Sequence, residues 1–492
     1  MSVSLTSGLT RRQCCGRLMT LVGALAVGGC ATISPQEEQK LGRQEAEEVE
    51  RTVGLVRDRA VVEYVQAIGT RLAQATGRSD VTWQWAVADD PEANAFALPG
   101  GWTYVTRGLL ALCNREDELA GVLGHEMAHV LERHAAHRVS AATPLAVLFG
   151  VPSGVLGMVS PTLGGMVAGA GRAVSGLALA PYSREQENDA DRVGIALAAR
   201  AGWDPVALAG FLTSLERADA AAGASKPSSF FSTHPSTPDR VTKIQSIAGS
   251  TPRSSVAPIA GSRAALLGRL DGLVVGNNAA NGVFVKQLFL HPDLDLAVEM
   301  PANWKTANTP EAAGAVAPDE TAAVLIQVVG AGDDPVAGAK EDGLNDEQAK
   351  RLTRLKISGM PAATLTANTR DGTRVMLTWI AHRGTISRIT AVSDTKQWER
   401  YQEPLARAAA SCRPLRPDDR TRITESRLRV RSARGGETIA QVIARGGSTW
   451  SPAQAAVANG VAADRRLERD WPVKVAVSEH YRANPGATPA SR

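Results

Sequence analysis

The pentapeptide His125-Glu126-Met127-Ala128-His129 constrains this chain more than any other feature. Apolar residues recur at helical spacing through residues 119–131, which predicts a helix across it. Residues four apart lie on one helix face, so the imidazoles of His125 and His129 can point at a single ion. Neutral imidazole suits zinc, and two histidines leave room for a third protein ligand and a water. Glu126, beside the first ligand, can take a proton from that water, so we expect one zinc ion per chain with Glu126 as the base.

The third metal ligand must come from another segment. The acidic stretch 183–192 (SREQENDADR) offers several carboxylates. Glu187 and Asp191 are four apart and share a helix face, so one could bind the ion while the other steadies a ligand. A solvated charged helix fits the same spacing. His134 and His137 lie too far along the first helix to share the ion, and we expect them to be structural or surface residues.

Four blocks in this order resemble the gluzincin metallopeptidase family of the HtpX, CAAX prenyl protease and periplasmic BepA type. They are NAFALPGG at 94–101, HEMAH at 125–129, SREQENDADRVG at 183–194, and STHPS at 232–236 with Asp239-Arg240. The similarity covers residues 36–247. The resemblance implies that His125, His129 and Glu187 bind zinc, that Glu126 is the catalytic base and that Asp191 orients His125.

The same resemblance implies roles for residues around the metal. The strand containing Asn94, Ala95 and Phe96 would pair with an extended substrate by main-chain hydrogen bonds. His234 matches a histidine that can occupy the fourth zinc position as a resting-state switch. Arg240 matches an arginine that could stabilise the oxyanion. For both His234 and Arg240, packing within a loop is the alternative role.

The length of 492 residues predicts two or three domains. We expect an α+β fold: a mainly helical gluzincin zinc-metalloprotease domain with a small β-sheet, then a smaller α+β domain and a small LysM-like unit. The expected divisions are a lipoprotein signal peptide at 1–29, the metallopeptidase domain at 30–248, a linker at 249–285, the α+β domain at 286–415, the LysM-like module at 426–480 and a disordered tail at 481–492.

Local patterns predict several individual elements. Residues 35–76 are expected to be helical, 94–105 a hairpin and 350–355 a helix. The uncharged, Pro- and Gly-containing stretch 141–171 is expected to be an apolar lid or a membrane-contacting loop rather than a membrane span. Cys113 and Cys412 have no metal-type spacing, and we expect two buried free thiols, with a disulfide between them as the alternative.

The N-terminus predicts export. Basic residues precede an uncharged run at 18–29, which is too short to span a bilayer and has the proportions of a signal peptide. The sequence VGGC at 27–30 resembles a lipobox, which implies a lipidated Cys30 and anchoring to the outer membrane, facing the periplasm. A plain secretory signal and a soluble periplasmic protein are the alternative.

Together these patterns predict a zinc endopeptidase whose substrates are polypeptides, in particular misfolded or misassembled proteins of the cell envelope. The net charge of +4 is small and no basic stripe is present, so nucleic acid is not an expected partner. The LysM-like segment suggests contact with peptidoglycan. The alternative is a catalytically silent chaperone or peptidoglycan-linked adaptor that uses the same metal domain.

Overall fold

The computed structural model describes residues 34–482 except 136–180, 222–228, 238 and 369–371. The expected signal peptide, Cys30, the uncharged stretch 141–171 and the tail from residue 483 lie outside the described residues. Within the described part of the chain, no helix is long and apolar enough to cross a membrane.

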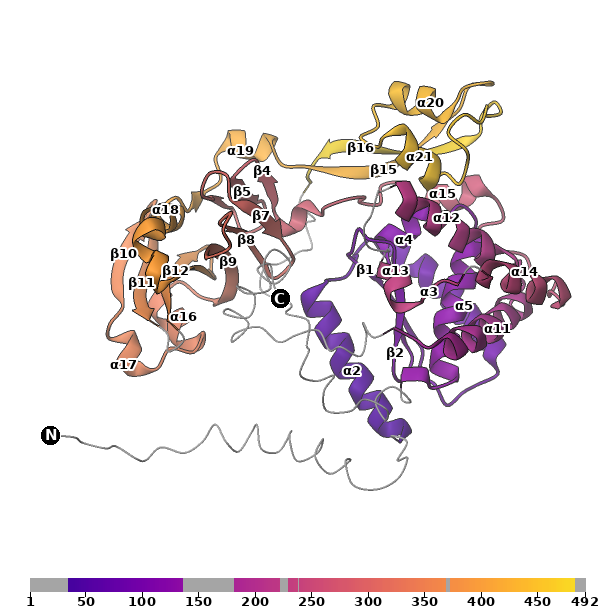
Figure 1. The fold of residues 1–492 in the computed structure, drawn as a ribbon, viewed down its shortest axis with the longest axis horizontal. Helices are drawn as coiled ribbons and strands as arrows, with labels where there is room; N and C mark the ends of the chain where they lie inside the picture. The colour runs from indigo at the N-terminus through magenta and orange to yellow at the C-terminus, as the bar shows by residue number, and fades with distance from the viewer. Residues whose placement is uncertain (1–33, 136–180, 222–228, 238, 369–371, 483–492) are drawn as a thin grey trace.

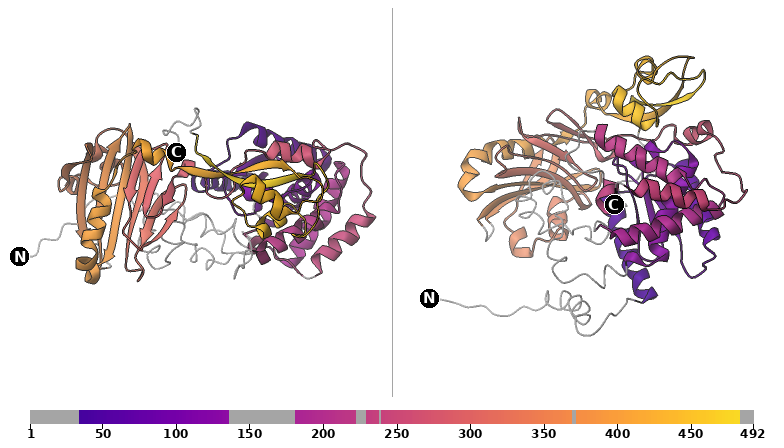
Figure 2. Two further views of the ribbon diagram at one scale, coloured as in Figure 1. Left: turned by 90° about the horizontal axis from the view of Figure 1, so that it is seen from above. Right: turned by 45° about the vertical axis from the view of Figure 1, so that its right-hand side comes forward.

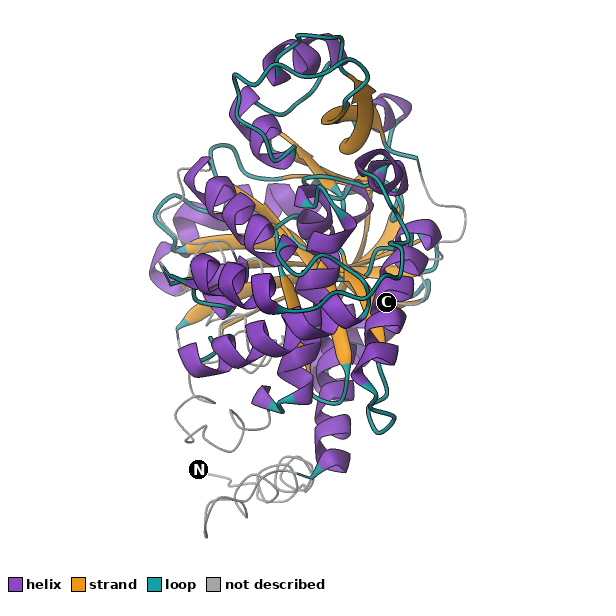
Figure 3. Ribbon diagram, turned by 90° about the vertical axis from the view of Figure 1, so that its right-hand side faces the viewer, coloured by secondary structure: helices purple, strands orange, loops and turns teal. Residues whose placement is uncertain are grey.

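Helices and sheets are both present, so the α+β class is confirmed. The described strands form sheets of three, seven, four and two strands. Figure 1 shows most helices around the three-stranded sheet on the right, the seven-stranded sheet on the left and the two-stranded sheet above. The chain thus forms a first unit around the three-stranded sheet, a second around the seven-stranded sheet and a C-terminal unit with the two-stranded sheet. In the view coloured by secondary structure, the first unit consists mainly of helices (Figure 3).

The first unit carries the predicted metal-binding residues. Its elements are α2 (Pro35–Thr52), α3 (Arg59–Thr76), β1 (Gln84–Ala88), β2 (Ala95–Leu98), β3 (Trp102–Thr106), α4 (Arg107–Leu112), α5 (Glu116–Leu131), α11 (Arg184–Arg200), α12 (Ala207–Ala221), α13 (Ser229–Thr233), α14 (Arg240–Ser250) and α15 (Arg263–Leu270). The sheet order is β1-β3-β2, with β1 parallel and β2 antiparallel to β3. The predicted hairpin is therefore present, and Gly100 and Gly101 form its turn with φ of 81° and 109°.

The prediction of one helix over 35–76 is wrong. The helix ends at Thr52, and Gly54 follows with a positive φ of 77°. A second helix then begins at Arg59, where the carboxylate of Asp58 accepts hydrogen bonds from the main-chain N–H groups of Ala60 and Val61. Apolar periodicity continues through the break, so only the turn residues and the cap mark it.

The interval 249–285 is not the linker that the sequence predicts. It contains α15, whose Leu266, Leu267 and Leu270 are fully buried in the same core as α3 and α5. The chain then pairs with a strand of the C-terminal unit, because the N–H of Gly272 donates to the carbonyl of Leu428 at 2.8 Å. This interval therefore joins two units by packing and hydrogen bonds.

The second unit is built around the seven-stranded antiparallel sheet, of order β10-β11-β12-β13-β9-β8-β7, and a four-stranded sheet of order β14-β6-β5-β4. Its elements are η2 (Ala279–Asn281), β4 (Val283–Val285), β5 (Leu288–His291), β6 (Leu296–Glu299), β7 (Lys305–Asn308), β8 (Ala312–Val316), β9 (Ala322–Ala331), α16 (Pro335–Glu341), α17 (Asp346–Ala349), β10 (Thr353–Ile357), β11 (Met360–Asn368), β12 (Thr373–His382), β13 (Thr385–Asp394), η3 (Thr395–Gln397), α18 (Trp398–Ala410) and β14 (Arg413–Pro414). The predicted helix at 350–355 is wrong, because strand β10 occupies the second half of that interval and pairs with β11.

The C-terminal unit consists of α19 (Pro417–Thr421), β15 (Thr424–Ser432), α20 (Ile439–Gly446), α21 (Pro452–Ala458) and β16 (Pro472–His480). Strands β15 and β16 pair antiparallel, and the two helices lie between them in the chain. The LysM-like identity of this unit remains a prediction. The view from above and the view turned by 45° both place it against the first unit (Figure 2). There the buried ammonium of Lys474 donates to the carbonyls of Ala111 and Cys113 at 2.6 and 2.9 Å.

Cys113 and Cys412 are buried free thiols, as expected. Burial raises the pKa of both thiols, that of Cys412 to about 12. They belong to different units: Cys113 lies just after α4, and Cys412 just before β14.

The first turn of α5 depends on a buried carboxylate. Glu116 is 2% exposed. One of its oxygens accepts hydrogen bonds from the indole of Trp203 at 2.7 Å and the N–H of Ile259 at 2.6 Å. The other accepts from the hydroxyl of Tyr64 at 2.9 Å and the N–H of Ala260. A single side chain therefore ties α3, the α11–α12 connection and the segment before α15 to the start of α5.

Replacing Glu116 with alanine should lower the free energy of unfolding by about 3 kcal/mol or more, because four donors, most of them buried, lose a charged acceptor. Chemical unfolding followed by circular dichroism measures this. The matched control is Glu63→Ala, which removes an exposed carboxylate from α3 and should change stability by under about 1 kcal/mol. Equal effects of the two substitutions would contradict the assigned role of Glu116.

Candidate metal centre

Two helices cross so closely that their backbones touch beside the predicted metal ligands. A Cβ atom on Gly194 of α11 would lie 2.7 Å from the main-chain nitrogen of His125, and one on Gly124 would lie 3.0 Å from the carbonyl oxygen of Gly194. A side chain at 194 would clash with the backbone of α5, and one at 124 would press tightly against the backbone of α11. The crossing places the HEMAH face of α5 against the acidic face of α11.

Four buried side chains converge at this crossing. Nε2 of His125 lies 3.1 Å from Nε2 of His129 and 3.3 Å from Nδ1 of His234. A carboxylate oxygen of Glu187 lies 2.9 Å from Nδ1 of His234 and 3.4 Å from Nε2 of His129. The four candidate ligand atoms all lie within 4.8 Å of one another. Residues that are distant in sequence thus form one cluster of three imidazoles and one carboxylate.

This donor set fits zinc. A tetrahedral site with metal–ligand bonds of about 2.0–2.1 Å has ligand–ligand separations of about 3.3–3.4 Å, and the distances quoted above scatter around that value. Burial lowers the pKa of His129 well below its ordinary value, which favours the neutral imidazole that metals require. Burial alone would raise the pKa of Glu187, but the charges of His234 and His125 hold it well below its usual range. Glu187 is therefore a carboxylate in this site.

Glu126 lies at the cluster without belonging to the tetrahedron. Its side chain is completely buried, and neither oxygen has a hydrogen-bond partner among the described residues. One oxygen lies 3.4 Å from Nε2 of His234. Burial raises the pKa of Glu126, which makes its carboxylate a stronger proton acceptor than an exposed one. A buried carboxylate with unsatisfied oxygens is costly unless the site uses it.

Asp191 and Arg240 contact the candidate metal ligands on the side away from the cluster. Asp191 lies 2.9 Å from Nδ1 of His125, the ring nitrogen that faces away from the cluster. The guanidinium of Arg240 donates two hydrogen bonds to Asp191, both at 2.9 Å, and lies 2.7 Å from Glu187. Arg240 was expected near the oxyanion, but its guanidinium faces these two carboxylates. Its place in the structure is that of a positioning residue.

His234 sits where a fourth ligand would bind. The residue follows α13, and its ring stacks on Phe230 at a centroid distance of 4.6 Å. Its N–H donates to the carbonyl of Phe230 at 2.8 Å, so the loop is anchored beside the cluster. The packing role that the sequence left open for His234 is thus combined with direct contact to candidate ligands.

Two further residues contact His129. Tyr182 stacks on its imidazole at a centroid distance of 3.7 Å, and Nδ1 of His134 lies 2.9 Å from its Nδ1. Helical rise predicted that His134 would lie too far along the helix to share the ion, and among the described residues it is not one of the four candidate ligands. However, α5 ends at Leu131 and Arg133 adopts a left-handed φ of 54°, which turns the chain back toward the site. The role of His134 beside His129 was therefore missed, because no sequence pattern marks this turn.

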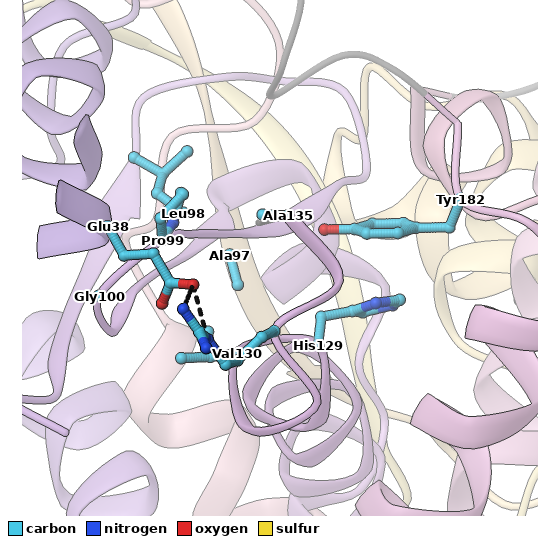
Figure 4. Close-up of a pocket in the computed structure, with 10 residues that line it drawn as sticks. Glu38, Ala97, Leu98, Pro99, Gly100, His129, Val130, Ala135 and Tyr182 are labelled. Atoms are coloured by element: carbon cyan, nitrogen blue, oxygen red, sulfur yellow. Dashed lines mark hydrogen bonds and ion pairs between the residues drawn. The ribbon is translucent and has the colours of Figure 1, made fainter. Parts of the chain in front are cut away.

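The predicted substrate strand lies next to the cluster. Ala95 and Phe96 are in β2, one of the two outer strands of the three-stranded sheet within the described residues, and Asn94 directly precedes it. A hollow beside β2 includes His129 and Tyr182 in its wall (Figure 4). Pairing of this strand with a substrate remains a prediction.

Replacing Arg240 with glutamine should weaken zinc binding about 10- to 100-fold, because Asp191 and Glu187 lose the cation that holds them. Competition with a chromophoric chelator measures the affinity. Lys243→Gln, which removes an exposed charge from the same helix, is the matched control and should bind zinc as the wild type does. An unchanged zinc affinity with slower peptide hydrolysis would instead support the oxyanion role.

Comparison with known proteins agrees with the geometry. Residues 60–248 match the model of Peptidase family M48. The chain is 37% identical over 183 residues to the mitochondrial metalloendopeptidase OMA1 of Schizosaccharomyces pombe, covering 37% of this chain and 51% of that protein. It is 32% identical over 215 residues to the beta-barrel assembly-enhancing protease of Yersinia pestis, covering 42% of each chain.

The chain spans about half the length, or less, of these curated relatives. The beta-barrel assembly-enhancing protease of Escherichia coli strain K12 is also similar, at 28% identity over 208 residues and 42% of each chain. The family match contains all the residues of the buried cluster together with Glu126, Asp191 and Arg240. Residues 60–248 of this chain are therefore a domain of peptidase family M48.

Proposed function

We propose that this domain is a zinc-dependent endopeptidase, with His125, His129 and Glu187 as metal ligands and Glu126 as the general base. The observation that carries the proposal is the fully buried carboxylate of Glu126, which has no hydrogen bond among the described residues and lies against a buried three-imidazole cluster. A purely structural metal site gains nothing from such a carboxylate, whereas hydrolysis requires one.

Zinc, when bound, supplies the Lewis acidity that polarises a peptide carbonyl and lowers the pKa of water. Glu126 accepts a proton from the attacking water and later delivers it to the leaving amine. Asp191 and Arg240 hold His125 and Glu187 in place, so the ligands need not reorganise during the reaction. The main chain of β2 would align an extended substrate beside these groups.

The substrates that we propose are unfolded or misassembled proteins of the cell envelope. Two considerations support this class. Strand pairing recognises the main chain of an extended segment and depends little on its sequence. Two of the relatives named above are beta-barrel assembly-enhancing proteases, which points to envelope proteins as substrates for this chain as well.

His234 favours a second candidate function. Four protein ligands close a zinc site, whereas a catalytic site keeps one position for water or substrate. Because Nδ1 of His234 lies with the other three candidate ligand atoms, a permanently closed site would make the domain a metal-stabilised binding protein or adaptor. We infer instead that His234 is a resting ligand that leaves before catalysis, since the retained Glu126 has no use in a closed site.

Casein cleavage by the mature chain distinguishes these functions when zinc content is measured in parallel. Glu126→Gln should retain zinc but lose at least about 100-fold in rate, because the proton acceptor is gone. His234→Ala should retain zinc and cleave faster than the wild type. The control is Glu132→Gln, an exposed carboxylate just after α5. If every variant binds zinc and none cleaves casein, the binding-protein function takes precedence.

We also propose that Cys30 is lipidated and anchors the protein to the outer membrane, facing the periplasm. The support comes from the sequence: a basic N-terminus, the short uncharged run 18–29 and the lipobox-like residues 27–30. The described fold begins at residue 34, so only a few residues would separate the anchor from α2.

Cells grown with a radioactive fatty acid should label the wild-type chain, and Cys30→Ser should abolish the label and release the protein from the membrane fraction. Cys113→Ser is the matched control, because this thiol is buried and is not available to an acyl donor. Labelling that persists in Cys30→Ser would exclude Cys30 as the anchor, and a soluble, unlabelled wild type would favour the plain secretory signal.

A further inference from the structure

A hollow opens beside the metal cluster, between the end of β2, the end of α5 and helix α2 (Figure 4). Its wall includes one candidate metal ligand, His129, and the aromatic ring of Tyr182. The remaining wall is formed by residues 97–100 at the end of β2 and its turn, together with Glu38, Val130, Arg133 and Ala135. The hollow therefore touches the metal cluster on one side and the predicted substrate strand on the other.

This position restricts which substrate side chain can enter. A peptide that pairs with β2 runs along residues 95–98, and its side chains alternate between the two faces of the sheet. Because the hollow is lined by both the end of β2 and His129, the side chain that enters it belongs to a residue next to the bond that is cleaved.

Uncharged groups make up most of the lining, and the two charged residues at the hollow pair with each other. The guanidinium of Arg133 lies 2.6 Å and 2.7 Å from one carboxylate oxygen of Glu38 through two of its nitrogens. The side chain of Glu38 is 12% exposed and that of Arg133 is 37% exposed. Charges in such a partly shielded position act on a nearby substrate more strongly than fully exposed ones.

Glu38 and Arg133 both lie on segments whose position is fixed by the fold. A Cβ atom on Gly42 of α2 would lie 1.7 Å from the carbonyl oxygen of Pro99, so α2 lies directly on the turn after β2. Arg133 is placed by its left-handed turn after α5. The ion pair therefore links two well-packed elements across the hollow.

We propose that this hollow is a substrate subsite for an uncharged side chain, and that the Glu38–Arg133 pair determines the charge it accepts. Each charge alone would attract a substrate side chain of the opposite sign, and the pair makes the rim neutral. A charged substrate residue must compete with the partner already in place and also lose water against the apolar wall. This inference rests on the proposed peptidase function.

Peptide kinetics test the proposal. The bond that the enzyme cleaves in casein is mapped first, using whichever of wild type and His234→Ala is active. Peptides around that bond then carry Gln, Glu or Lys at the residue on either side. At one of the two positions we expect the highest kcat/KM for Gln in the parent enzyme.

Glu38→Gln should raise the Glu-to-Gln ratio of kcat/KM about three- to tenfold at that position, and Arg133→Gln should raise the Lys-to-Gln ratio similarly. The double variant should return both ratios to within about twofold of the parent. The changes should shrink at high salt, since the pair is partly exposed.

Arg133→Lys keeps the charge and should keep the parent ratios, which separates charge from packing. Arg59→Gln and Glu63→Gln make the same charge changes in an exposed pair on α3 and should also leave the ratios unchanged. The proposal is overturned if the variants at 38 and 133 cleave the Gln peptide normally with parental ratios, or if Arg133→Lys behaves as Arg133→Gln does. If no enzyme cleaves any peptide, the proposed function fails instead.

Discussion

The contact between α5 and α11 at Gly124 and Gly194 is the constraint on which the rest of the site depends. Helix axes normally stay 8–10 Å apart because side chains separate them. Here a Cβ on Gly194 would collide with the backbone at His125. With both glycines present, Glu187, which lies on the same face of α11 as Gly194, reaches the imidazoles of α5. Any residue larger than glycine at 194 would move that carboxylate away from the cluster.

Charge balance explains why these side chains tolerate burial. Glu126, Glu187 and Asp191 contribute three buried carboxylates, and Arg240 contributes one buried guanidinium. The two remaining negative charges match a divalent cation, which would satisfy the cluster better than protons on the histidines. Arg240 serves this balance by bridging two of the carboxylates. The guanidinium of Arg240 lies beside Asp191 and Glu187 because its positive charge neutralises part of their negative charge.

The sequence predicted those features that depend on local geometry. The spacing of His125 and His129 within a helix, the hairpin around residues 99–101 and the helix that carries Glu187 all follow from short-range periodicity. Predictions failed where a turn or long-range packing determined the position of a segment. The break after Thr52 depends on one glycine and one cap, and α15 is buried although the composition around it is typical of a linker. The return of His134 toward His129 depends on a left-handed residue that no pattern marks.

By itself, then, the sequence determined the metal-binding chemistry, because two histidines and a glutamate at helical spacing are already neighbours once the helix forms. The family resemblance supplied the distant ligand. Only the tertiary structure decided how the remaining groups act: that Arg240 faces carboxylates, that His234 takes the fourth corner of the cluster, and that Glu38 meets Arg133 beside β2. The physical reason is that these contacts join segments far apart in the chain. Their geometry is set by how the helices pack, which local sequence propensity does not predict.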